Sequence, residues 1–148
     1  AKRNPQGDPF FARTPSNPEE YFLLGLGVGL YWGEGNKKNF SAVRLGNTDP
    51  DLMRAFIRFL EKIYSVRKEK FRFGLQIFSD MKPKDALRFW TNALKISSSQ
   101  FGKVIVTPAR GVGNYREKTK HGVLTVYVSN VKLRKLLGNE IEKLRRIR

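Results

Sequence analysis

The fold of this chain is decided by residues 17–35, which read NPEEYFLLGLGVGLYWGEG. Asn17 is a good helix N-cap and Pro18 suits the first helical position. Glu20 stands three residues after the cap, where the carboxylate of a capping box belongs. The final glycine of the stretch is placed to end a helix. We therefore predict a helix that begins after Asn17 and ends at about residues 32–33.

Three glycines of this helix form a ridge. Gly25, Gly29 and Gly33 recur every four residues, and Leu26 and Leu30 lie beside them. Each glycine costs a helix about 1 kcal/mol relative to alanine, so three on one face need a reason. A glycine ridge lets another backbone approach closely. Two partners are open at this point: an equivalent helix of a second subunit or domain, or the protein's own sheet.

An acidic residue stands at the end of the same helix. Glu34 adds a carboxylate where the helix dipole is already negative, which is unfavourable by itself. A divalent cation such as Mg²⁺ would reverse this, because carboxylates and exposed helix-end carbonyls, such as that of Gly33, are hard oxygen ligands. The alternative is that Glu34 is simply solvated.

The composition narrows the choice of function. The 148 residues are 40% hydrophobic and 12% aromatic, enough for the core of one domain. Because there is no cysteine, disulfides, thiol nucleophiles, zinc fingers and iron–sulfur clusters are excluded, and the single histidine, His121, excludes multi-histidine metal sites. Lys and Arg number 29 against 13 Asp and Glu, a net charge of +16, so the expected partner is a polyanion.

The chain divides into an irregular basic arm, residues 1–16, and a domain, residues 17–148. Its start has no secretory signal, and the longest apolar stretch, residues 21–32, is too short to span a bilayer. We expect no membrane partner and a location in the cytoplasm, the nucleoid or an organelle interior, not secretion.

The rest of the chain alternates strands and helices. The predicted strands are residues 40–45, 71–78, 103–107 and 123–128, and the last two are expected to form a hairpin with a long basic tip. The predicted helices begin at about Asp51, at Pro83 with Ser97–Ser99 closing it, and after Asn130. The helix from Asp51 is expected to bury Leu52, Phe56, Phe59, Leu60 and Ile63. An α+β domain with one antiparallel sheet backed by helices follows.

One face of that sheet is suited to DNA. If the apolar sides of the strands face the helices, the opposite side presents Arg44, Arg72, Gln76, Lys103, Thr107, Thr125 and Tyr127. Arg and Gln form bidentate contacts with guanine and adenine edges, and a β-ribbon enters the major groove. The hairpin tip adds Arg110, Arg116, Lys118 and Lys120 as phosphate contacts. The alternative for the tip is a solvated basic loop.

The end of the first helix resembles a known motif. Residues 27–35, GVGLYWGEG, resemble the signature of the LAGLIDADG homing endonucleases. The positions that match are Gly29, Leu30 and Gly35, with Gly33 at the small residue and Glu34 at the catalytic acid. The later strands and helices suit that family's saddle-shaped αββαββα core over residues 18–145. The chain departs from the pattern in having Trp32 where the motif has Asp, and one strand instead of a hairpin before Asp51.

The resemblance implies a homodimeric, site-specific DNA endonuclease. Two helices would pack through Gly25, Leu26, Gly29, Leu30 and Gly33, and the paired Glu34 carboxylates would bind Mg²⁺, with Ca²⁺ or Mn²⁺ as substitutes. Lys103 and Gln76 are candidates for auxiliary catalytic residues, and otherwise for plain DNA contacts.

Two other functions stay open. A protein of this kind that has lost cleavage would be a DNA- or RNA-binding protein, such as a transcription factor or a splicing maturase. Separately, Pro50-Asp51 and Asp80-Met81-Lys82 contain the elements of a PD-(D/E)xK nuclease site, although Asp51 is expected at a helix start.

Overall fold

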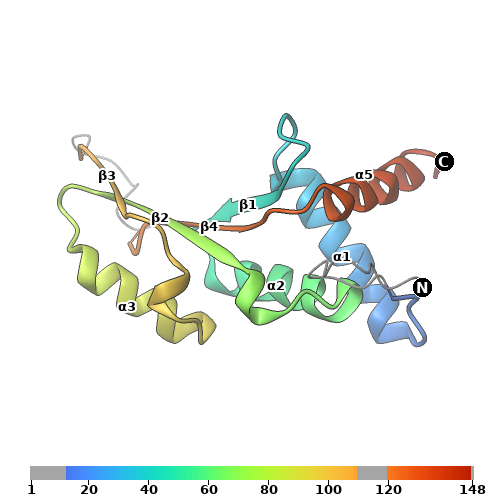
Figure 1. Cartoon of the computed structure of the whole chain (residues 1–148), viewed down its shortest axis with the longest axis horizontal. Coiled ribbons are helices and arrows are strands. Elements are labelled where there is room, and N and C mark those ends of the chain that lie inside the picture. Colours follow the sequence, from blue (N-terminus) through green and yellow to red (C-terminus); the bar gives the residue numbers. More distant parts are fainter. Residues whose placement is uncertain (1–12, 110–119, 148) are drawn as a thin grey trace.

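A computed structural model describes residues 13–109 and 120–147 and shows an α+β fold built on a four-stranded sheet (Figure 1). The helices of the described residues are α1 (Pro18–Glu34), α2 (Pro50–Tyr64), α3 (Pro83–Leu94) and α5 (Val131–Arg145), with the short 3₁₀ turns η1 (Lys68–Lys70) and η2 (Ser98–Gln100). The strands are β1 (Val43–Asn47), β2 (Arg72–Phe78), β3 (Ile105–Thr107) and β4 (Val123–Val128). The predicted α+β class and order of elements are confirmed.

Polar side chains start the helices as the sequence predicts. The side chain of Asn17 accepts a hydrogen bond from the Glu20 amide at 2.9 Å, and Asn130 accepts one from the Leu133 amide at 2.9 Å. The capping box is displaced by one residue, because the Glu20 carboxylate accepts from the Ser16 amide at 2.9 Å. These caps satisfy amide groups that the first helical turn leaves without partners.

The end of α3 differs from the prediction. The helix stops at Leu94, and Lys95 takes a left-handed conformation with φ 53°. The serines that were expected to close α3 lie further on, where Ser97 begins η2 with a capping box to Gln100. At the other end of the core, α2 begins at Pro50 behind the N-cap Asp49, one residue earlier than predicted.

The sheet is mixed, with the order β1-β4-β2-β3. β4 pairs antiparallel with β1 and β2, whereas β2 and β3 are parallel. The predicted wholly antiparallel sheet and the predicted hairpin of residues 103–107 and 123–128 are therefore wrong. The physical reason is the crossover through α3, which returns the chain beside β2 in the same direction, while β4 inserts between β1 and β2.

Strand β1 starts later than predicted because asparagine side chains close the loop before it. The Asn36 amide group donates to the Asn39 and Ala42 carbonyls at 2.7 and 3.0 Å, and its Oδ1 accepts from the Arg44 amide at 2.9 Å. Phe40, which was expected in the strand, is 68% exposed. In the described structure, β1 is the one strand between α1 and α2, as predicted.

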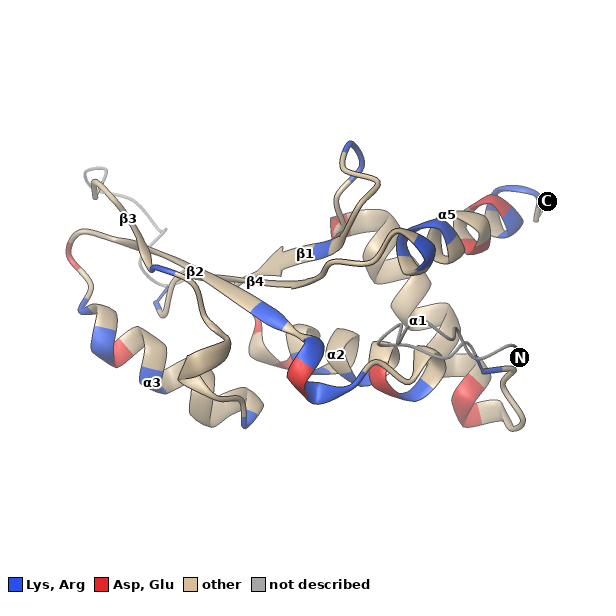
Figure 2. Cartoon of the chain, in the orientation of Figure 1, with Lys and Arg blue, Asp and Glu red and all other residues tan. Residues whose placement is uncertain are grey.

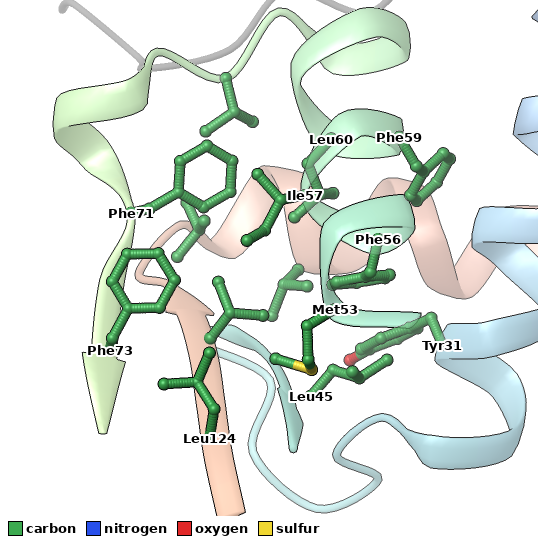
Figure 3. Close-up of a cluster of buried hydrophobic side chains, with 14 of the residues drawn as sticks. Tyr31, Leu45, Met53, Phe56, Ile57, Phe59, Leu60, Phe71, Phe73 and Leu124 are labelled. Atoms are coloured by element: carbon green, nitrogen blue, oxygen red, sulfur yellow. The ribbon is translucent and has the colours of Figure 1, made fainter. Parts of the chain in front are cut away.

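The apolar side of the sheet packs against the helices in one core (Figure 3). Phe73 and Leu124 point from β2 and β4 toward α2, which supplies Met53 and Ile57. Leu52 was expected in this buried stripe, but it is only partly buried, and Met53 takes the inner position. Figure 1 shows α2 and α3 on the same side of the sheet, and Arg44, Arg72 and Gln76 on its other side are exposed.

Candidate functional site

One side of α1 is packed tightly inside the subunit. Val28 and Tyr31 are buried against the core, and Tyr31 stacks on Phe56 with ring centroids 6.3 Å apart. A Cβ atom added to Gly27 would lie 2.0 Å from Cγ of the fully buried Phe59. A side chain at residue 27 would therefore have to displace α1 from α2.

The opposite side of α1 carries the predicted glycine ridge. A Cβ atom added to Gly25, Gly29 or Gly33 would meet no atom within 4 Å in the part of the chain that the structure describes. Leu26 is exposed beside them and Leu30 is partly exposed. Of the two partners considered from the sequence, the chain's own sheet does not cover the ridge.

The ridge and the acid share one shallow groove of about 430 Å³. It is lined by Gly25, Leu26, Gly29, Leu30, Gly33, Glu34 and Leu52. The structure thus brings together the whole predicted interface and its acid, and it adds Leu52, which the helical pattern of α2 assigned to the core.

Two aromatic residues that the sequence reasoning did not assign extend this apolar surface toward the start of α1. Tyr21 and Phe22 are 58% and 72% exposed, and Phe22 precedes Gly25 by one helical turn. The helical spacing of Phe22 from the ridge could have identified it. A helix that is apolar on all sides normally has all sides covered, yet one side of α1 is left exposed by the described residues. None of the helices in the described residues has the length and apolarity to cross a membrane.

A lysine occupies the end of α1. Lys37 Nζ lies 2.5 Å from the Trp32 carbonyl oxygen, 3.0 Å from that of Gly35 and 3.4 Å from that of Tyr31. A cation at this position stabilises the negative end of the helix. The carbonyl groups at the helix end were predicted as metal ligands, but most of them accept hydrogen bonds from Lys37. The carbonyl of Gly33 is not among those that contact Lys37.

Glu34 is exposed, and among residues 13–109 and 120–147 its carboxylate forms no hydrogen bond or ion pair. Within those same ranges, no three Asp, Glu, His or Cys side chains gather as a metal site. Among the described residues that line the groove, Glu34 is the acid, so a metal site at Glu34 would require further ligands.

The carboxylates of the alternative nuclease motif have other surroundings. Asp51 is in the first turn of α2 and forms an ion pair with Arg54 at 2.5 Å. Asp80 lies in the turn that follows β2. Asp51 thus stands at a helix start, as expected from the sequence, with its carboxylate paired to Arg54.

The open face of the sheet carries the predicted polar residues in rows. Arg44, Tyr127 and Arg72 are neighbours across β1, β4 and β2. The Arg44 guanidinium lies 5.4 Å from the centre of the Tyr127 ring. Four residues along β2, Gln76 Nε2 donates to Thr107 Oγ1 at 2.9 Å. This hydrogen bond places Gln76 and Thr107 on the same face, as predicted.

Between these two rows, the residues on the outer face of the sheet have small side chains or none. Gly46, Thr125 and Gly74 are neighbours across the three strands, and a Cβ atom at Gly74 would meet nothing within 4 Å in the described structure. Glycine inside a strand commonly marks a close approach by another molecule. The position of Gly74 inside the predicted strand of residues 71–78 was a signal for this, whereas Gly46 was expected in the turn after residue 45 and lies in β1.

The remaining predicted DNA contacts are less well placed. Lys103 is exposed but precedes β3, so it lies outside the strand in which it was expected. Lys120 is exposed beside β4. Arg110, Arg116 and Lys118 lie outside the described residues.

His121 has a structural role in the contact with α3. Its ring stacks on Phe89 with centroids 3.5 Å apart, and its carbonyl oxygen accepts from Trp90 Nε1 at 2.8 Å. Burial, together with the nearby Lys120 ammonium, lowers the pKa of His121. Both effects favour the neutral imidazole, and the contacts of His121 with Phe89 and Trp90 are made to α3.

No family model, no curated protein and no solved structure matches this chain, so the comparisons with known proteins assign no function to it. Figure 2 shows Lys and Arg distributed over the strands and the helices, including β1, β2 and α5. The evidence for function is thus the open ridge, the acid at its end and the basic sheet.

Proposed function

We propose that this chain is a homodimeric DNA endonuclease of the LAGLIDADG type, which binds duplex DNA across its sheet and cleaves it with Mg²⁺ at paired Glu34 residues. The observation that carries this proposal is the glycine ridge of α1, which no other described residue covers and which ends at an exposed acid without an ion pair in the described structure. Three glycines on an uncovered helix face stabilise neither the helix nor the core, so their use is contact with another molecule.

A second α1 is the partner that suits this face best. Two-fold pairing is self-complementary, so the ridge of one copy would lie against the ridge of the other. The exposed Leu26 and Phe22 would then lose their contact with water, which favours association by about 25 cal/mol per Å². The same pairing would bring both Glu34 carboxylates to the two-fold axis.

The role of Glu34 follows from its charge. Two carboxylates at one axis repel each other and favour binding of a cation between them. A divalent cation held there would supply water activation and stabilisation of the leaving oxygen in phosphodiester hydrolysis. Glu34 would hold and orient the cation, and the sheet residues would position the DNA strand that is cleaved.

The open face of the sheet would contact the duplex. Arg44 and Gln76 present planar hydrogen-bonding groups that read base edges in the major groove. Gly74 between them, where a Cβ atom would meet nothing within 4 Å in the described structure, would let DNA approach the backbone of β2. A strand rises about 3.3 Å per residue, so Arg72 and Gln76 lie about 13 Å apart along β2, the length of roughly four base pairs.

One observation favours a second candidate function, a non-catalytic DNA- or RNA-binding protein with the same dimer. The Lys37 ammonium sits on the carbonyls at the end of α1, next to the proposed metal position. A fixed cation there neutralises part of the negative charge that would attract Mg²⁺. Binding by the sheet does not depend on this region.

A cleavage assay separates the two functions. The chain is incubated with a randomised duplex library and Mg²⁺, and cut ends and bound DNA are both sequenced. The endonuclease proposal expects cutting that Glu34→Gln reduces at least a hundredfold while DNA binding persists. Glu19→Gln removes an exposed acid at the opposite end of α1 and is the matched control, expected to cut like the unchanged chain.

Equal cutting by the unchanged chain and Glu34→Gln, with binding retained, would favour the non-catalytic protein. In either case, affinity should fall on the order of 10³ to 10⁵-fold between 50 and 200 mM salt if six to ten phosphates are neutralised. An affinity that hardly changes with salt would contradict nucleic-acid binding altogether.

A further inference from the structure

A second groove lies on the far side of the α1 terminus, between α5 and the loop that precedes β1. Its volume is about 570 Å³, within the range of roughly 300–1,000 Å³ for pockets that hold small ligands. Trp32 and Phe40 line one side of it, and Arg134 and Lys135 line the α5 side. Figure 1 shows this loop and the start of α5 at the same end of the sheet.

Arg134 is unusual in this groove. Its side chain is 8% exposed, and in the part of the chain that the structure describes its Nε has no hydrogen-bond partner. The guanidinium lies 5.4 Å from the centre of the Tyr31 ring and 5.0 Å from that of Phe40. No carboxylate of the described residues pairs with it. A buried guanidinium with an N–H group that lacks an acceptor among the described residues is costly, which makes Arg134 a candidate to bind an acceptor from outside the chain.

The helix leaves room for the guanidinium itself. Gly138 stands one turn after Arg134 on α5, and a Cβ atom there would lie only 3.3 Å from Arg134 Nη1. Glycine destabilises a helix interior relative to alanine. The glycine therefore accommodates the enclosed Arg134 guanidinium at some expense in helix stability.

The groove attracts anions. Lys37, Lys135 and Arg145 line it together with Arg134, against the single acid Glu142. The Arg145 guanidinium also lies 5.8 Å from the centre of the Trp32 ring. A planar guanidinium fork matches a phosphate group, to which it donates two parallel hydrogen bonds.

Aromatic faces narrow the ligand further. Phe40 is 68% exposed and Trp32 is 39% exposed at the wall of a cationic groove. Unpaired bases stack on such side chains, whereas a simple anion gains nothing from them. Arg134 already lies over one face of Phe40, so the base and the phosphate would sit close together, as they do in one nucleotide.

We propose that this groove binds one unpaired nucleotide, with its phosphate on Arg134 and its base against Phe40. The groove adjoins the end of the sheet where Val43 pairs with Val128, next to the row of Arg44. The site is separate from Glu34 and from the glycine ridge, so it does not depend on dimer formation or cleavage. It would let the protein hold a single-stranded or flipped-out nucleotide beside a bound duplex.

Tryptophan fluorescence offers a direct test. Trp90 is fully buried, so a response to ligand in the groove comes from the partly exposed Trp32. The full chain is titrated at 150 mM salt with deoxyadenosine 5′-monophosphate, with deoxyadenosine and with inorganic phosphate. We expect the nucleotide to bind at least about tenfold more tightly than deoxyadenosine or inorganic phosphate, because stacking contributes about 1–3 kcal/mol per base.

Variants assign the two contacts. Phe40→Leu changes an exposed loop residue and should weaken nucleotide binding about tenfold while leaving phosphate binding unchanged. Arg134→Met should remove binding of both, and a thermal melt checks that it folds. Arg88→Gln removes an equal charge from an exposed position on α3 and is the control, with unchanged binding expected.

Two outcomes would overturn the proposal. If phosphate binds as tightly as the nucleotide, or if Phe40→Leu binds the nucleotide normally, the groove is a simple anion site. If folded Arg134→Met retains nucleotide affinity, the binding arises elsewhere on this basic chain. Because Phe40 is exposed, its variant decides the question even if Arg134→Met does not fold. Cleavage of duplex DNA is measured separately, so loss of one proposal leaves the other intact.

Discussion

The two sides of α1 contain the same residue type under opposite constraints. On the inner side, Gly27 is pressed against the Phe59 ring, and any side chain there would collide with the core. On the outer side, Gly25, Gly29 and Gly33 face no atom of the described structure within 4 Å. Packing within the subunit explains the first glycine. Packing among the described residues does not explain the other three, for which we propose contact with a second copy, and this difference can be measured.

The largest effect is expected from Gly27→Ala. The new methyl group would overlap the Phe59 ring, and overpacking of this kind costs about 3 kcal/mol of unfolding free energy. Urea denaturation measures it. Gly29→Ala is the matched control on the outer side, where the better helix propensity of alanine should stabilise the monomer by up to about 1 kcal/mol. A similar loss in both variants would show that the outer side is also packed within the subunit.

The next effect is on association. Gly29→Leu should weaken self-association about tenfold to a hundredfold, since a large side chain prevents close approach of two helices at a cost of about 1–3 kcal/mol. Sedimentation velocity over a range of concentrations measures the dimer. Arg88→Leu adds the same side chain to an exposed position of α3 and should leave association unchanged. A chain that stays monomeric at all concentrations would remove the basis of the paired acid site.

Alkaline pH tests the inner side of α1. Burial raises the pKa of Tyr31 to about 12 from an ordinary value of 10.0, against a smaller opposing effect of Arg134. The unfolded chain therefore loses this proton first, and stability should fall as pH rises from about 10 to 12, by about 1.4 kcal/mol per pH unit. Below pH 10, both states keep the proton and Tyr31 adds no pH dependence.

Tyr31→Phe isolates this contribution, because burial also raises the pKa of Tyr64. The variant loses the hydrogen bond from the Tyr31 hydroxyl to Asn36 Oδ1, about 1 kcal/mol at neutral pH. Its stability should then decline less steeply above pH 10 in urea titrations. An unchanged slope would mean that Tyr31 is accessible to solvent, contrary to its place in the core.

The smallest effect concerns the helix end where the two sides meet. Lys37→Met removes the ammonium from the last carbonyls of α1 and should cost about 1 kcal/mol, measured by thermal or urea unfolding. Lys38→Met changes a neighbouring exposed lysine for which the described structure shows no such contact, and should cost less than half as much. Equal losses would indicate a general charge effect instead of a cap.

Local interactions made much of the fold predictable. Asn17 and Asn130 cap helices that begin beside them, and the alternation of residues 71–78 identified β2 because one face of that strand is buried. The hairpin was wrongly predicted, because nothing in residues 103–107 says which strand they will pair with. That choice depends on where α3 returns the chain, which is a property of the whole sheet.

The candidate site divides in the same way. The glycine ridge and Glu34 were predictable, since helical spacing places them on one face and at one end. The Lys37 cap was not, because it depends on how the Asn36 side chain folds the following loop. Nor was the burial of Arg134, which charge patterns assign to solvent and which only the packing of Phe40 and Tyr31 encloses.

The amino-acid order alone determined a helix with three glycines along one face and a terminal acid, because spacing along a helix converts directly into position on its surface. Tertiary packing decided which glycine is covered, which strand joins β2 and which arginine is enclosed. Those outcomes depend on contacts between residues that are distant in the chain. The free energies of alternative contacts compete, and the competition is decided only when the core forms.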